Sequence, residues 1–262
     1  GGAITASGAV NIDSGGTIAL NAAIASATTV HIDAGGVTTV AAAGDITASD
    51  VVVFGATLTG TLTTSGDITT TNDAITFTRA VTLGGAVVLD TGANAGNILF
   101  SSTIASATNA LTLDAGDGGN ITLGALTGGG ALSVTDGAAQ VYAVLTVAAL
   151  TISDATTSVT FGGAITATGA TDIDSGGTIA LNAAMSGTTI AIDAAGLTTV
   201  AAAGDITASG VVGFGASKTG LLTTSGNITT TNDAITFTRA VTLAGAVVLD
   251  TGANAGNILF SS

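Results

Sequence analysis

Apolar and small polar residues alternate along this chain in short runs. The segments "AITFT" (74–78), "VTL" (81–83), "ALTLD" (110–114) and "NITL" (120–123) carry Ile, Leu, Val or Phe at every second position. A period of two is typical of strands that bury one face. Between such runs lie "SGG", "AGG", "TGAN" and "GDGGN", where Gly, Asn and Asp supply the backbone angles of sharp corners. The pattern predicts short β-strands and frequent turns, without long helices.

Several apolar runs end in Asp followed by a small residue, and this motif recurs at a short, nearly regular interval. Neighbouring examples lie about 20 residues apart, and one wider gap is close to three such intervals. The aspartates of this motif are Asp13, Asp33, Asp90, Asp114, Asp136, Asp154, Asp174 and Asp193. Phe54, Phe77 and Phe100 suggest a competing interval of about 23 residues, but fewer landmarks support it. We therefore interpret these Phe residues as core residues at different corners of successive turns.

A second repeat is much longer. Residues 1–102 align with residues 162–262 across a single-residue deletion, and "ITTTNDAITFTRAVTL" occurs at both 68–83 and 228–243. The sequence therefore predicts a tandem unit of about 160 residues, or about eight short intervals. Residues 1–161 form the first unit, and residues 162–262 form a second, incomplete unit continuous with it. We expect the chain to be a window on a longer array.

Two architectures fit short strands with frequent turns: a sandwich or barrel of hairpins, and a coil in which each interval stacks on the one before. Near-identical units of irregular length place like residues above like, which favours the coil. The predicted fold is an all-β parallel β-solenoid with about 20 residues per coil. The preference for right-handed crossovers between parallel strands predicts a right-handed β-helix.

Composition narrows the possible partners. The chain has 262 residues, of which 47% are hydrophobic and only 3% aromatic, and it contains no Cys, Trp or Pro. Its net charge is −14, with Arg79, Lys218 and Arg239 as the only Lys or Arg residues. Nucleic acid and anionic membrane surfaces are therefore not expected partners, because both are bound through several basic side chains. No apolar run is long enough for a membrane span, so membrane insertion is not expected either.

The segment "LTLDAGDGGNITLGALTGGGALSVTDG" at 111–137 combines L-T-L-x-A-G, G-N-I-T-L and G-A-L-x-V-T motifs. In these motifs the chain resembles the repetitive rods of bacterial surface proteins of the filamentous haemagglutinin type, and the likeness extends over its whole length. The resemblance implies a secreted right-handed β-helix used for attachment, surface coating or filament formation.

Catalytic chemistry finds little support in the sequence. His31 is the only histidine, and Ala191 occupies the equivalent place in the second copy, so we expect a surface position and no catalytic base. One His and no Cys leave zinc or redox metals without a ligand set. We therefore expect no enzyme activity, no catalytic residue and no resident cofactor.

Calcium is the one metal for which the sequence offers candidate ligands. In "DAGDGGN", Asp114, Asp117 and Asn120 form a loose candidate calcium loop. The competing interpretation, which we prefer, is that the aspartates accept backbone N–H bonds and stabilise the turns.

The two arginines occupy equivalent positions in the copies. Alternation from Ile75 and Phe77 would direct Arg79 into the core, where an unpaired guanidinium is prohibitive. We expect a corner at Thr78–Ala80 to turn it outward, and Arg79 and Arg239 each to form a salt bridge with an Asp of an adjacent coil or of a neighbouring subunit. Lys218 stands where the first copy has Leu58, so that position is predicted to be exposed.

Together these features predict a structural segment of a secreted, tandem-repeat β-solenoid that forms an extracellular fibre, sheath or adhesin stalk on a bacterial surface. Expected partners are copies of the chain, end to end or laterally, with surface polysaccharide as a further candidate. One alternative is a solenoid module that binds polysaccharide or calcium. A less favoured one is a β-helical polysaccharide lyase or hydrolase, since the Lys, Arg and aromatic residues that hold sugars are scarce.

Overall fold

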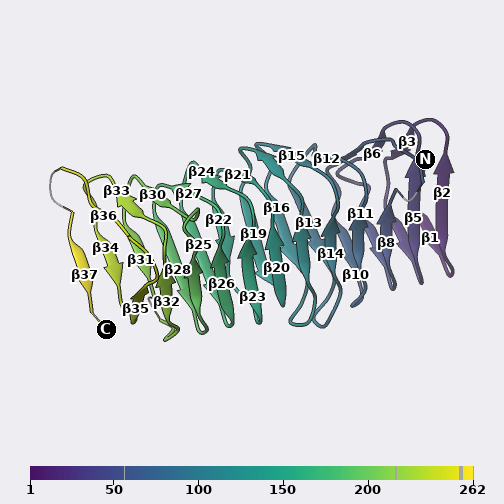
Figure 1. Ribbon diagram of the computed structural model, residues 1–262. Coiled ribbons are helices and arrows are strands. Elements are labelled where there is room, and N and C mark those ends of the chain that lie inside the picture. Colours follow the sequence, from purple (N-terminus) through teal and green to yellow (C-terminus); the bar gives the residue numbers. More distant parts are fainter. Residues whose placement is uncertain (56, 216, 254–255, 262) are drawn as a thin grey trace. The chain divides into compact units, whose positions relative to one another are not determined.

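The chain folds into successive three-stranded coils of parallel β-structure. The computed structural model describes residues 1–55, 57–215, 217–253 and 256–261. The chain divides into two compact units, Gly1–Ala138 (unit 1) and Ala139–Ser262 (unit 2). Each is a parallel β-solenoid with about 21 residues per turn, and its strands form three parallel sheets (Figure 1). In the described residues there is no helix, and hence none that could cross a membrane.

In unit 1, each coil contributes one strand to each of three sheets, which we call 1A, 1B and 1C. Sheet 1A contains β1 (Ile4–Ala6), β4 (Ile24–Ser26), β7 (Ile46–Ala48), β10 (Ile68–Thr70), β13 (Val87–Asp90), β16 (Leu111–Asp114) and β19 (Leu132–Asp136). Sheet 1B contains β2 (Val10–Ser14), β5 (Val30–Ala34), β8 (Val52–Phe54), β11 (Ile75–Phe77), β14 (Ile98–Phe100) and β17 (Ile121–Leu123). Sheet 1C contains β3 (Ile18–Leu20), β6 (Thr38–Val40), β9 (Leu62–Thr64), β12 (Val81–Leu83), β15 (Ile104–Ala107) and β18 (Leu126–Gly128).

Unit 2 is built in the same way, from sheets 2A, 2B and 2C. Sheet 2A contains β20 (Ala139–Tyr142), β23 (Ser158–Phe161), β26 (Thr178–Leu181), β29 (Thr198–Val200), β32 (Leu222–Thr224) and β35 (Val241–Leu243). Sheet 2B contains β21 (Leu145–Val147), β24 (Ile165–Ala167), β27 (Met185–Gly187), β30 (Ile206–Ala208), β33 (Ile228–Thr230) and β36 (Leu249–Asp250). Sheet 2C contains β22 (Leu150–Ile152), β25 (Thr171–Ser175), β28 (Ile190–Ala194), β31 (Val212–Phe214), β34 (Ile235–Phe237) and β37 (Ile258–Phe260).

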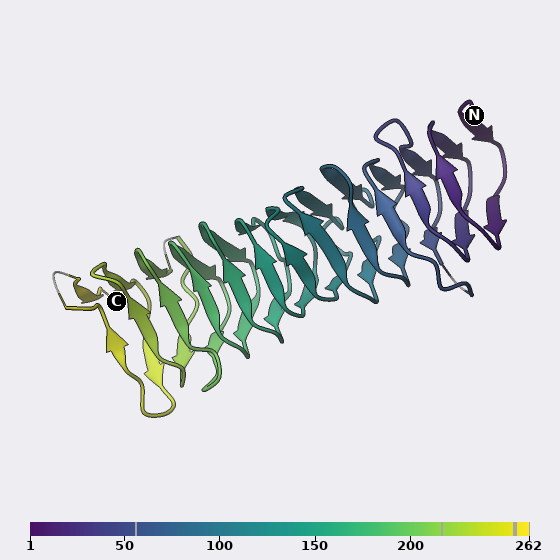
Figure 2. The ribbon, with the colours of Figure 1, turned by 90° about the horizontal axis from the view of Figure 1, so that it is seen from above.

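Backbone hydrogen bonds join each coil to the next within a unit. Val10 N–H donates to Thr29 O at 3.0 Å, Val30 N–H to Val51 O at 3.0 Å, and Val52 N–H to Ala74 O at 2.9 Å. Figure 2 shows the strands of successive coils lying side by side within each unit. Each coil therefore satisfies the backbone of its neighbours, as the parallel pairing predicted from the sequence requires.

Alternating residues fill the interior, as the period of two predicts. In β8, Val52 and Phe54 are fully buried, whereas Val53 between them is only half-buried. Ile, Val, Leu and Phe thus point into a narrow core, and Thr, Ser and Ala occupy most outward positions. The all-β parallel solenoid predicted from the sequence is confirmed.

The Phe residues differ from the prediction. Phe54, Phe77 and Phe100 pair in register on β8, β11 and β14, and their rings stack with centroids 5.3 and 4.3 Å apart. They therefore share one position in three successive coils and do not occupy different corners. The longer spacing that they mark is the local coil length, because residues bonded across these coils, such as Thr78 and Gly55, are 23 apart. Longer connections widen these coils without changing the register of the strands.

One polar pair lies inside the core of unit 2. Tyr142 is fully buried, and its hydroxyl donates to Gln140 Oε1 at 2.7 Å. The Gln140 amide in turn donates to the backbone oxygen of Asp154 at 3.2 Å. Burial raises the pKa of Tyr142, because the phenolate would lose its hydration in the core. Tyr142 therefore stays protonated and packs against Phe161 like another core aromatic, with ring centroids 5.3 Å apart.

Candidate functional sites

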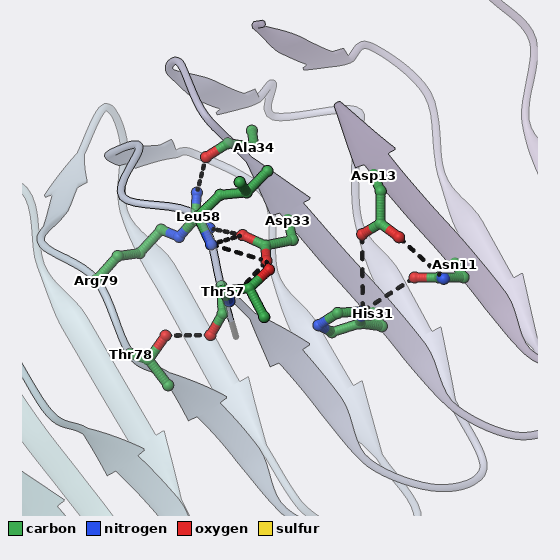
Figure 3. A network of polar contacts seen from close by, with 10 residues as sticks. Asn11, Asp13, His31, Asp33, Ala34, Thr57, Leu58, Thr78 and Arg79 are labelled. Carbon is green, nitrogen blue, oxygen red and sulfur yellow. Dashed lines mark hydrogen bonds and ion pairs between the residues drawn. The ribbon is translucent and has the colours of Figure 1, made fainter. Parts of the chain in front are cut away.

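The first candidate site is a buried ion pair at one corner of unit 1. Arg79 follows β11, Asp33 lies at the end of β5, and β8 runs between these two strands. An Arg79 Nη2–H donates to Asp33 Oδ1, and an Nη1–H donates to Ala34 O at 3.3 Å (Figure 3). Both residues are nearly excluded from solvent, with 4% of the Arg79 side chain and 2% of the Asp33 side chain exposed. The pair thus joins two coils that are not adjacent.

The coil between the two residues has a longer connection between its strands, which makes room for this pair. The connection from β8 to β9 spans residues 55–61, whereas that from β11 to β12 spans only residues 78–80. Gly55 has φ +76°, and a Cβ there would lie 2.3 Å from Arg79 Nε. Glycine is required at this turn both for the positive φ and for the close approach of the guanidinium. The missing Cβ of Gly55 therefore leaves room for the arginine side chain.

The Asp33 carboxylate also organises the looped segment. Its Oδ2 accepts the Thr57 N–H and the Thr57 hydroxyl, both at 2.8 Å, and the Leu58 N–H at 3.1 Å. A carboxylate with several donors and a guanidinium partner is satisfied in a buried position that would otherwise be prohibitive. The connection and the ion pair therefore stabilise each other.

Unit 2 repeats the arrangement. Arg239 Nη2–H donates to Asp193 Oδ1 at 2.6 Å, and an Nη1–H donates to Thr198 Oγ1 at 3.3 Å. Asp193 Oδ2 accepts the N–H and the hydroxyl of Ser217 at 2.7 and 2.8 Å, and the Lys218 N–H at 3.1 Å. Burial alone would raise the pKa of Asp193, but the bonds from Ser217 and Lys218 and the charge of Arg239 outweigh it and hold this pKa below its ordinary value.

Two expectations about the arginines are wrong: they do not turn outward, and their aspartate partners lie two coils away and not on the adjacent coil. The corner at Thr78–Ala80 does not turn Arg79 outward: Arg79 and Arg239 are only 6% and 3% exposed. The pairing with aspartate and the room beside the longer connection make burial possible. The position of Lys218 is exposed in the first copy, where Leu58 is 38% exposed, and partly exposed in the second, where the ammonium pairs with Asp174 and 25% of the side chain is exposed.

His31 lies on the outer side of sheet 1B, partly exposed (Figure 3). Its Nδ1 is 2.9 Å from Asn11 Oδ1, an oxygen that accepts a hydrogen bond when this nitrogen carries the proton. Asp13 Oδ1 lies 3.9 Å from the same nitrogen, and the Asn11 amide donates to Asp13 Oδ2 at 3.1 Å. These contacts join two adjacent coils at the surface.

The candidate calcium residues belong to turns in unit 1. Asp114 Oδ1 accepts the Gly116 N–H at 3.1 Å, and Oδ2 accepts the Thr135 hydroxyl at 2.9 Å. The Asn120 N–H donates to Asn97 Oδ1 at 2.8 Å. Across the described residues, no three His, Cys, Asp or Glu side chains are grouped as metal ligands, so Asp114 and Asp117 do not join a third carboxylate. The geometry of Asp114 is that of a turn-stabilising residue.

The second candidate site is a hollow of about 380 Å³ on the outer side of sheet 2C. An outward row of residues in register crosses it: Thr151, Asp172, Ala191, Gly213 and Thr236. Further lining comes from Asp174, Asp193, Gly215 and Ser217, so the hollow adjoins the buried ion pair. Sequence reasoning missed this feature, although the change from large to small residues between the copies is visible in the alignment.

The folds of both units define the protein as a parallel β-solenoid. Comparisons of the chain with protein-family models, with curated proteins and with solved structures found no match in any of the three.

Proposed function

We propose that this chain is a structural segment of a secreted, tandem-repeat β-solenoid that forms an extracellular fibre, sheath or adhesin stalk on a bacterial surface. Its partners are then copies of itself, joined end to end or laterally. No reaction is assigned to it, and its role is mechanical.

The observation that carries the proposal is the continuous backbone pairing between coils inside each unit. Parallel ladders link every coil to its neighbours, and fully buried aliphatic and aromatic side chains fill the space between the sheets. Breaking a coil away from its neighbours requires the loss of several hydrogen bonds and the wetting of apolar side chains together. A stack of this kind suits load-bearing use.

Two sequence features support the same proposal. The near-identity of residues 1–102 and 162–262 fits an array in which each copy adds a similar segment. The resemblance of residues 111–137 to rods of the filamentous haemagglutinin type supports a location outside a bacterial cell. An excess of Asp over Lys and Arg gives neighbouring copies like charge and keeps them dispersed until specific contacts form.

Two measurements on the native material test the proposal. Antibodies raised against the chain should label filaments or a surface layer on intact, unpermeabilised cells, and antibody pre-absorbed with the purified chain should not. Aligned native material should give a meridional reflection near ~4.8 Å, the spacing of paired strands along the solenoid axis.

Labelling confined to permeabilised cells would contradict the extracellular assignment. Surface material that carries the epitope without an axial repeat near ~4.8 Å would contradict the fibre.

A further inference from the structure

The two copies differ at few positions, and several of the differences meet at the hollow of sheet 2C. Ala191 and Gly213 replace His31 and Val53, and Asp172 replaces Asn11. At the edge, Lys218 and Ser217 replace Leu58 and Thr57. All these positions lie on adjacent coils or in the neighbouring connection, although they are far apart in the sequence.

The first pair of changes removes bulk from the outer surface. In unit 1 the equivalent row on sheet 1B carries Asn11, His31, Val53 and Thr76 in register. In unit 2 a Cβ added to Gly213 would meet no atom within 4 Å, so the space above it is open. With neighbouring strands ~4.8 Å apart, the depression over Ala191 and Gly213 separates Asp172 from Thr236 by roughly 14 Å.

The other changes alter the charge around this space. Lys218 is paired with Asp174, and Arg239 is paired with Asp193, so both basic side chains near the hollow are neutralised. Asp172 is exposed, and within the described part of the chain its carboxylate has no hydrogen-bond or ion-pair partner. One uncompensated negative charge therefore lies at the wall of an open, mostly apolar depression in a chain of net charge −14.

We propose that this hollow binds a primary ammonium group carried on a short aliphatic stem. The ammonium lies at Asp172, with the hydroxyl of Thr151 on the adjacent strand as a second acceptor. The stem covers Ala191 and Gly213 and points toward Thr236. A free aliphatic diamine and a lysine side chain of a partner protein share this chemistry. Recognition of a small cation goes beyond the structural role proposed above and does not depend on it.

Titrations of the isotopically labelled chain, followed by amide chemical shifts, test the proposal. Pentylamine should cause saturable shifts at Ala191 and Gly213, with smaller shifts from pentan-1-ol and none from pentanoate, since the three probes share a stem and differ in charge. The equivalent amides of His31 and Val53 should not move. Asp172→Asn should weaken pentylamine binding about five-fold, the effect of losing one partly exposed ion pair.

Variants taken from the first copy separate a specific site from general attraction to an acidic surface. Ala191→His combined with Gly213→Val fills the hollow with residues that unit 1 accommodates at the same places, and should abolish binding. Leu197→Val, which also restores a first-copy residue but does not line the hollow, should leave binding unchanged.

Cadaverine and Nα-acetyl-lysine methylamide then identify the source of the ammonium group, since saturable binding of either one supports the site. The proposal is overturned if pentanol binds as well as pentylamine, if the filled variant binds unchanged, or if the shifts spread equally over other aspartates.

Discussion

Each unit buries the charged guanidinium group of one arginine. Arg79 and Arg239 lie at positions where strand alternation points inward, and each has a Nε atom without a hydrogen-bond partner. The terminal nitrogens pair with Asp33 and Asp193, which in turn bind the looped connections. Removing one partner of such a pair leaves an uncompensated charge in a site closed to water, which costs more than the pair itself contributes.

Arg239→Met should therefore lower the free energy of unfolding of unit 2 by about 3–5 kcal/mol, measured by chemical denaturation. Lys218→Leu is the matched control, because it breaks a partly exposed pair with a residue that unit 1 carries, and it should cost at most about 1 kcal/mol. The double variant Asp193→Asn/Arg239→Met should recover part of the loss, since neither charge is then left unpaired. Equal losses for Arg239→Met and Lys218→Leu would contradict a structural role for the buried pair.

The lowered pKa of Asp193 gives this pair a defined pH dependence. The folded state lowers the pKa of Asp193 relative to the unfolded state. The contribution of this carboxylate to the free energy of unfolding is therefore fully present above the unfolded pKa of about 3.9. The contribution is lost as the pH falls through the folded value. Thermal unfolding of unit 2 should thus be insensitive to this group between pH 5 and 7 and shift to lower temperature below about pH 4. In the double variant Asp193→Asn/Arg239→Met the acid shift should be smaller; an unchanged shift would assign it to other groups.

At the scale of the strands, in-register stacking decides which side chains meet. Phe214, Phe237 and Phe260 repeat the stack of the first copy, with ring centroids 5.4 and 4.7 Å apart. Phe237 is fully buried between its neighbours, as Phe77 is at the equivalent position of the first copy. The stack therefore closes the ring of Phe237 off from water.

Phe237→Ala should destabilise unit 2 by about 3–5 kcal/mol, because it opens a cavity between two rings that the strand register prevents from closing. Leu221→Thr is the control, because Leu221 is 58% exposed and Thr61 occupies its place in the first copy, and it should cost about 0.5 kcal/mol or less. Denaturant midpoints of the two variants provide the comparison. Similar midpoints would mean that the coils repack freely and that the stack contributes little.

At the scale of the whole molecule, charge is the property that every copy shares. The chain carries 17 acidic and 3 basic side chains, and both buried arginines are already paired with aspartate. Its isoelectric point is about 4.1. Mutual repulsion at neutral pH therefore opposes lateral association of copies.

Lowering the pH from 7 to about 4 should accordingly increase light scattering, since protonation removes the repulsion near the isoelectric point. At pH 7, about 0.5 M NaCl should act in the same direction by screening the charges. Far-UV circular dichroism distinguishes association of folded coils from unfolding. Scattering that stays flat to pH 4 while the β-signal persists would contradict charge control of association.

Much of the fold is predictable from local pattern, for a physical reason. Alternation identifies the strands, Gly, Asn and Asp identify the corners, and tandem identity favours stacking over a closed sandwich. The predicted coil length of about 20 residues is slightly shorter than the observed one of about 21. The Asp motif follows the shorter coils, whereas the connection at residues 55–61 lengthens another. The chain divides into its compact units after Ala138, whereas the sequence repeat begins again at residue 162, since packing and sequence similarity divide the chain by different criteria.

Residue type and spacing alone specify the strand periodicity, the repeats, the acidic surface and the scarcity of reactive side chains, so these properties can be predicted without the fold. Which distant residues come into contact depends on the packing of the coils in three dimensions. The pairing of Arg79 with Asp33 depends on strands two coils apart and on the space that Gly55 leaves between them. The hollow at Ala191 and Gly213 depends on the register that places two small residues side by side on adjacent strands.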